Sequence, residues 1–137
     1  MSVPGWVKST GAVLAGFATT VALSTAADAV MHGTGIFPPF GQVMSDGLFA
    51  LAAAYRIVFT VAGAYVTARL APDRPMAHAW VLAGIGLLAG IAGVVAYYRI
   101  GGPEMGPAWY AIQIPLTAIP CVWLGARLAI AHRKVAA

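Results

Sequence analysis

The chain has 137 residues, of which 61% are hydrophobic and only 9% are charged, and its formal net charge is +4. A soluble domain carries roughly 25% charged residues, so the composition excludes a soluble globular enzyme. It also excludes a disordered chain, because disordered segments are poor in apolar residues. The sequence therefore predicts an all-α integral membrane protein, and the basic excess is assigned to membrane orientation rather than to nucleic-acid binding.

Four stretches are long and apolar enough to cross a bilayer core, which takes roughly 20 helical residues. They form one predicted transmembrane domain, residues 1–137. Arg56 interrupts the second stretch, and the fourth contains Pro115 and Pro120, which remove backbone hydrogen bonds and predict a kink. The predicted spans are residues 9–30, 47–70, 76–98 and 107–130.

Lys and Arg concentrate on one side of this predicted four-helix bundle. Only Arg99 lies in the connections on the other side. Basic residues favour the cytoplasmic side of a membrane, so we expect both termini in the cytoplasm. The residues on that side are Lys8, Arg69, Arg74, Arg127, Arg133 and Lys134.

The third span is rich in glycine. Gly86 and Gly90 form a GxxxG pair, and Gly93 lies close to the same helix face. Small residues allow the close backbone approach that drives helix association in lipid. These glycines are expected to pack against another helix of the bundle or against another subunit.

Two short strings recur between the halves of the chain. Residues 13–16 and 81–84 both read VLAG, and residues 68–71 and 126–129 both read ARLA. Either one hairpin was duplicated, its copies related by an axis along the membrane normal, or the match is coincidence in a sequence dominated by Ala, Leu and Gly.

Arg56 is the most informative single residue, because a charge inside a span usually faces the bundle interior or a cavity. It lies about 12 Å below the predicted outer boundary, counted from Leu48 at 1.5 Å per residue. Side chains tilt toward the N-terminus of their helix, so Arg56 and Asp28 should converge from opposite directions. The sequence predicts an Asp28–Arg56 ion pair, which Tyr55 could join. The pair either fixes the helix register or handles a ligand, an ion or a proton.

Asp28 and His32 are four residues apart and therefore share a helix face. With Asp46 as a third ligand they could hold a metal, but Ser45 or Asp46 would equally serve as the N-cap of the next helix. We favour no metal and no other cofactor, and we expect His32 at the outer interface, within reach of a carboxylate. In the apolar loop of residues 33–41, Phe37 and Phe40 should press against the membrane surface or the helix ends.

One set of strings carries a resemblance. The segment ARLAPDRPM of residues 68–76, together with Asp28, His32, the FPP of residues 37–39 and the pair Tyr55-Arg56, resembles small four-span bacterial inner-membrane proteins of no assigned activity. The resemblance implies a location in the bacterial inner membrane. It assigns no catalytic residue.

For function, the sequence favours a non-catalytic accessory or scaffold subunit of a larger membrane complex. The alternative is a small oligomeric transporter of an ion, a proton or a small molecule through the Asp28/Arg56 cluster. The third hypothesis is a membrane enzyme that acts on lipid or quinone. The expected partners are membrane lipid and other membrane subunits or further copies of the chain, and the candidate binding residues are Asp28, His32, Asp46, Tyr55 and Arg56.

Overall fold

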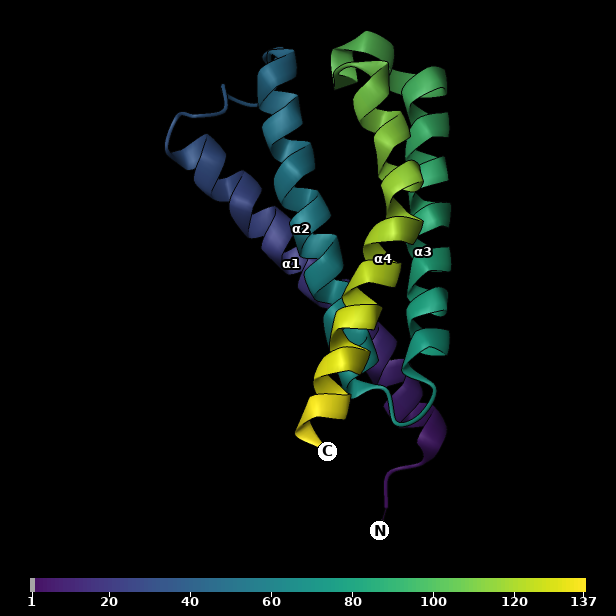
Figure 1. The fold of residues 1–137 in the computed structure, drawn as a ribbon. Helices are drawn as coiled ribbons and strands as arrows, with labels where there is room; N and C mark the ends of the chain where they lie inside the picture. The colour runs from purple at the N-terminus through teal and green to yellow at the C-terminus, as the bar shows by residue number, and fades with distance from the viewer. Residues whose placement is uncertain (1) are drawn as a thin grey trace.

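The computed structural model describes residues 2–137, and within them it contains only helices and connections (Figure 1). A π-helical turn and a 3₁₀ turn, Tyr97–Gly101 and Gly102–Met105, join the last two long helices. Each of the four long helices is apolar enough to cross a membrane, which confirms the predicted all-α membrane fold. These helices are α1 (Gly5–Gly33), α2 (Asp46–Leu70), α3 (Pro75–Ala96) and α4 (Ala108–Ala136).

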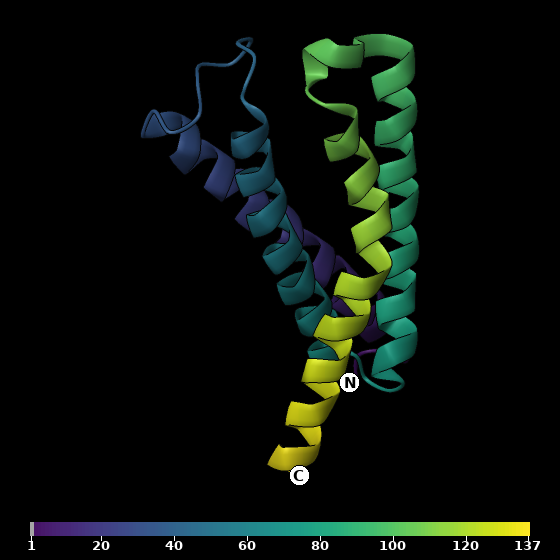
Figure 2. The same ribbon diagram turned by 45° about the horizontal axis from the view of Figure 1, so that its top comes forward.

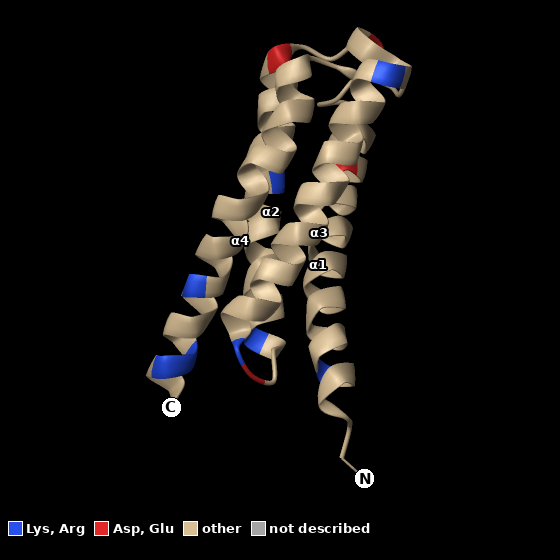
Figure 3. Ribbon diagram, turned by 90° about the vertical axis from the view of Figure 1, so that its right-hand side faces the viewer, with Lys and Arg blue, Asp and Glu red and all other residues tan. Residues whose placement is uncertain are grey.

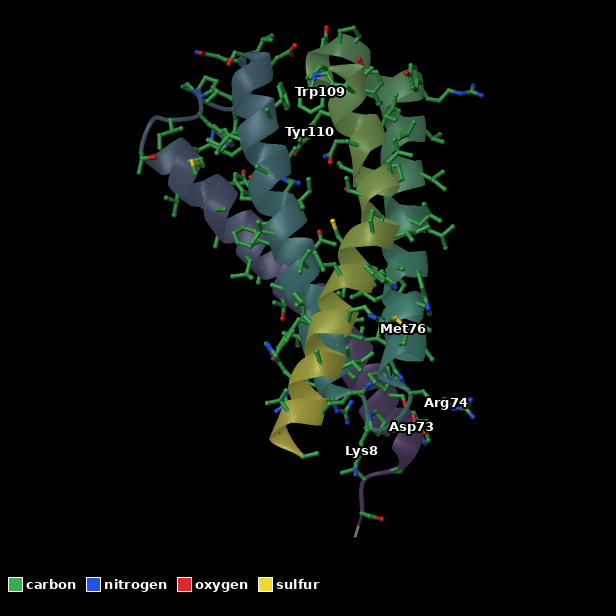
Figure 4. All side chains as sticks on the ribbon, viewed as in Figure 1. Lys8, Asp73, Arg74, Met76, Trp109 and Tyr110 are labelled. Atoms are coloured by element: carbon green, nitrogen blue, oxygen red, sulfur yellow. The ribbon has the colours of Figure 1, made fainter. Side chains whose placement is uncertain are left out.

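Both chain termini lie at the same end of the bundle (Figure 1). We call the half next to that end the terminal half, and the half next to residues 34–45 and 97–107 the loop half. Figure 3 shows that most Lys and Arg residues gather toward the terminal end. The turn with Asp73 and Arg74 lies there, as does Lys8 (Figure 4). The charge asymmetry read from the sequence is thus an asymmetry between the two ends of the bundle.

Local chemistry accounts for where two helices begin. The Ser45 hydroxyl accepts a hydrogen bond of 3.4 Å from the Leu48 amide, so Ser45 is the N-cap of α2 and Asp46 is its first residue. Pro75 opens α3, where its fixed φ suits the first helical position. Arg74, just before it, has a left-handed φ of 36°.

Glycines hold α1 and α2 together in the terminal half. A Cβ on Gly16 would clash with the Gly63 carbonyl, and a Cβ on Gly63 would clash with the Gly16 carbonyl. The two backbones are therefore in direct contact at this crossing. Thr67, which is fully buried, donates a 3.1 Å hydrogen bond from its hydroxyl to the Ala12 carbonyl of α1.

Helix α4 packs against a different partner in each half. In the loop half, Pro115 sits on Gly90 of α3, where an added Cβ would lie 2.9 Å from the proline nitrogen. In the terminal half, a Cβ on Gly125 would lie 2.8 Å from the Ala64 Cβ of α2. The helix continues through Pro115 and Pro120 but changes direction near its middle (Figures 1 and 2), as prolines that lack an amide donor allow.

The hydrophobic core also lies in the terminal half. Arg133 closes it by donating from Nη1 to the carbonyls of Ala68 and Ala71, at 3.1 and 3.3 Å, which ties the end of α4 to the end of α2. The Tyr65 hydroxyl lies 2.9 Å from Nδ1 of His132 and adds a second tie. The core residues are Val13, Ala64, Ala68, Ala79, Leu82, Ala83, Val122, Ala126 and Ala129.

The three glycines singled out in the third span have different surroundings. Gly90 makes the close contact with Pro115. A Cβ added to Gly86 would lie 3.7 Å from the Ala118 Cβ, which is an ordinary van der Waals distance. Gly93 has no atom within 4 Å of a built Cβ, so it makes no tight helix contact inside the chain. Gly16, Gly63 and Gly125, which make the tightest crossings, were not singled out from the sequence.

Candidate functional site

The polar cluster joins α1 to α2 in the loop half. Arg56 Nη2 lies 2.5 Å from Asp28 Oδ2, so the predicted ion pair is confirmed. The Tyr55 hydroxyl donates to the other carboxylate oxygen, Oδ1. Both oxygens of Asp28 therefore have a donor, and α1 is linked to consecutive residues of α2.

Arg56 has more donors than the protein uses. A guanidinium carries five N–H groups, and among residues 2–137 its one hydrogen bond is the bond to Asp28. Its Nε is buried without a hydrogen-bond partner. The Tyr110 ring of α4 lies with its centre 6.0 Å from Arg56 Cζ, within the range of a cation–π contact. Each oxygen of the carboxylate thus has one donor, whereas one of the five N–H groups of the guanidinium has an acceptor among these residues.

The cluster lines a cavity of about 530 Å³ to which all four helices contribute. Small-molecule sites typically measure about 300–1,000 Å³, so the volume suits a ligand. The walls are mainly apolar, and their uncharged polar residues are Thr20, Ser24, Thr25, Thr60, Tyr97, Tyr110, Gln113 and Thr117. Asp28 and Arg56 are the charged groups among the lining residues.

Two features of the fold create this cavity. In the loop half the α1–α2 pair diverges from the α3–α4 pair (Figures 1 and 2). The wall that α3 contributes is built from small residues, Gly86, Ala89 and Gly93, which leave the space unfilled. Toward the terminal half, the core residues Leu82 and Val122 form its floor.

The contribution of α4 to the site was missed by the sequence analysis. Tyr110 lies near the start of α4 (Figure 4) and was not among the candidate binding residues. Gln113 and Thr117 line the same cavity three and seven residues later. That spacing places the three polar residues on one helix face, and it could have been read from the sequence.

His32 and Asp46 do not join the cluster. His32 Nδ1 lies 2.9 Å from the Pro38 carbonyl rather than near a carboxylate, because the loop folds back over the end of α1. Its ring stacks on Phe40 with the ring centres 4.0 Å apart. Asp46 is exposed at the first residue of α2 and lines no part of the cavity.

The loop of residues 34–45 packs only in part. Phe37 is buried, whereas Phe40 is 84% exposed despite its contact with His32. Among residues 2–137 there is no group of three or more His, Cys, Asp or Glu side chains placed to hold a metal ion. Asp28, His32 and Asp46 are therefore not gathered into a three-ligand set.

Comparison with known proteins assigns no family. No protein-family model matches the chain, and neither the curated proteins nor the solved structures include a significant match. What the site can do thus follows from its own geometry, namely an ion pair with spare donors at the wall of a mainly apolar cavity.

Proposed function

We propose that this chain is a small multi-pass protein of the bacterial inner membrane that binds and transports a small molecule through the cavity that Asp28 and Arg56 line. The observation that carries the proposal is the position of the ion pair. A pair that only fixed two helices could be sealed by neighbouring side chains, yet the side chains of Asp28 and Arg56 remain 31% and 36% exposed, and both face the cavity. The sequence favoured an accessory or scaffold subunit and left the transporter as the alternative; the cavity supports the transporter.

The fold corresponds to one state of a transport cycle. Many transporters bind substrate near the bilayer midplane, between structural repeats that rock against each other. Here the cavity lies between the α1–α2 and α3–α4 hairpins and is closed toward the terminal half by the contact of Gly125 with Ala64. With the termini cytoplasmic, as the basic residues favour, this state faces outward. Separation of Gly125 from Ala64 would open the opposite side.

The chemistry of the lining favours an organic molecule over a bare ion or proton. Asp28 and Arg56 neutralise each other, and the remaining lining is mainly apolar. Such a surface gains free energy by covering apolar atoms and offers a metal cation few ligands. We therefore assign the cavity to a small molecule that dissolves in the membrane.

Two glycines of α3 give a matched test. Gly93 lines the cavity and Gly84 does not, and neither has an atom within 4 Å of a built Cβ. Gly93→Leu should fill the cavity, whereas Gly84→Leu adds the same side chain outside it. Native mass spectrometry of purified protein should detect a co-purified small molecule in the wild type and in Gly84→Leu, but not in Gly93→Leu. Proteoliposomes should then carry that molecule only with the first two proteins.

Equal occupancy in the Gly93→Leu variant would contradict the proposal. So would a wild-type protein that retains no molecule and moves none. Gly84→Leu controls for general effects of a leucine on α3, since it changes helix propensity by the same amount.

An accessory or scaffold subunit is the second candidate. Between 17% and 33% of the apolar window of each helix is buried inside the chain, so lipid or another protein must cover the rest. Affinity purification in a mild detergent should then recover a partner in fixed stoichiometry. A homo-oligomer of uniform size without such a partner would rule this candidate out.

A further inference from the structure

We propose that the molecule held in the cavity is an uncharged amphiphile, with an acceptor oxygen such as an ester or ketone carbonyl bound by Arg56 and an apolar body lying along α3 and α4. The inference rests on the proposed function and specifies its substrate class. It follows from the balance of donors, the balance of charge and the shape of the cavity walls.

The balance of donors selects an acceptor. Asp28 already accepts one hydrogen bond at each oxygen, from Tyr55 and from Arg56, so about half of its acceptor sites are in use. Arg56 uses one N–H in a hydrogen bond to the protein, and its side chain remains 36% exposed. Unpaired donors in an apolar environment are costly, and a carbonyl oxygen would satisfy one of them.

The balance of charge selects an uncharged ligand. The ion pair is neutral as it stands, so a carboxylate would leave the cavity with a net negative charge or displace Asp28 from Arg56. Either outcome places an unbalanced charge in a region of low dielectric constant, which costs several kcal/mol. An ammonium group would be repelled by Arg56 and would leave the cavity with a net positive charge. A neutral acceptor avoids both costs.

The walls select the remainder of the ligand. Phe17 and Val21 of α1 and Ile114 of α4 line the cavity, and above Leu82 the α3 wall has no large side chain, because Gly86 and Gly93 lie there. A slender alkyl or isoprenoid chain fits such a surface better than a branched polar molecule does. Hydrogen bonding at Arg56 and burial of the chain at the apolar wall together define an amphiphile.

Four ligands with the same alkyl body test the proposal. They are methyl decanoate, decanoate, decylamine and decane, each radiolabelled and measured by equilibrium binding to the wild-type protein in lipid nanodiscs, with binding to empty nanodiscs subtracted. A hydrogen bond to a charged group favours the ester over decane by about tenfold. Decanoate and decylamine should bind no better than decane.

Two substitutions locate the acceptor site. Arg56→Met, which removes every side-chain N–H donor, should lower the affinity for methyl decanoate about tenfold, to the level of decane. Asp28→Asn leaves Arg56 without its counter-ion, so this variant should bind decanoate better than methyl decanoate, the reverse of the wild type. Arg99→Gln, an exposed arginine in the connection between α3 and α4, is the control and should change nothing.

The possible outcomes separate the two proposals. If the four ligands bind equally, or if decanoate binds best to the wild type, the substrate class is wrong while the cavity still binds ligands. If none of the four ligands binds above the background and Gly93→Leu does not change the amount of co-purified molecule, both the substrate class and the proposed function are wrong. The wild-type series alone decides the substrate class, so the result does not depend on whether a variant folds.

Discussion

The two halves of the bundle contain the same small residues, but only the loop half also uses one of them to leave space open. In the terminal half, Gly16, Gly63 and Gly125 let backbones meet, and alanines fill the core. In the loop half, Gly93 faces open space at the wall of a cavity. A small residue in a membrane helix therefore indicates either close packing or reserved volume, and the residue that opposes it decides which.

The largest expected effect comes from breaking the closest crossing. Gly16→Leu places side-chain atoms against the Gly63 carbonyl and Thr67, neither of which can move without shifting α2. We expect the free energy of unfolding to fall by about 3 kcal/mol. Titration with dodecyl sulfate, followed by circular dichroism, would measure it.

Gly11→Leu on the same helix is the control for this substitution. Gly11 is exposed and has no atom within 4 Å of a built Cβ, so its variant should unfold at the wild-type detergent concentration. Equal loss of stability in the two variants would mean that the Gly16 crossing is not the tight contact.

Splitting the ion pair should give the next largest effect. Arg56→Gln leaves Asp28 without its counter-ion in the loop half, and we expect a loss of about 2 kcal/mol, less than for a fully enclosed pair because both side chains are partly exposed. Adding Asp28→Asn to Arg56→Gln should recover part of that loss. Strict additivity of the two single substitutions in a double-mutant cycle would show that the pair contributes no coupling energy.

A hydrogen bond in the terminal half should matter less. Thr67→Val keeps the side-chain shape but removes the bond to the Ala12 carbonyl of α1, for an expected loss of about 1 kcal/mol. Thr19 bonds to Ala15 of its own helix, so Thr19→Val should cost less. A larger loss for Thr19→Val in the same detergent titration would contradict this ranking.

The smallest effect on stability is expected where the loop half is open. Gly93→Leu should change the free energy of unfolding by less than about 0.5 kcal/mol, because the added atoms enter the cavity without meeting others. The detergent titration that shows a large loss for Gly16→Leu would then show almost none here. A loss above about 2 kcal/mol would mean that the space at Gly93 is filled in the folded protein.

The helices and the ion pair could be predicted because both depend on local rules. The length of an apolar stretch sets a span. The tilt of side chains along a helix brings Asp28 and Arg56 together from two neighbouring helices. Neither inference requires knowledge of which faces of distant helices meet.

The cavity and the tightest crossings could not be predicted in this way. Gly90 and Gly93 share a helix face in the sequence, and only the position of Pro115 makes one a contact and leaves the other open. The Gly16–Gly63 crossing joins residues 47 positions apart, and it has a weak signal in the spacing of Gly16 to Thr20 and of Gly63 to Thr67. His32 was expected within reach of a carboxylate, and its actual partner, the Pro38 carbonyl, depends on the path of the loop that follows it.

The burial of a cysteine next to Pro120 in α4 has a practical consequence. Cys121, the single cysteine of the chain, follows Pro120 in this helix and is buried. Its thiol can react with a maleimide only while α4 is separated from the helices that cover it. The labelling rate of the unmodified protein therefore reports how often the bundle opens at Cys121. No cysteine has to be introduced or removed for this measurement.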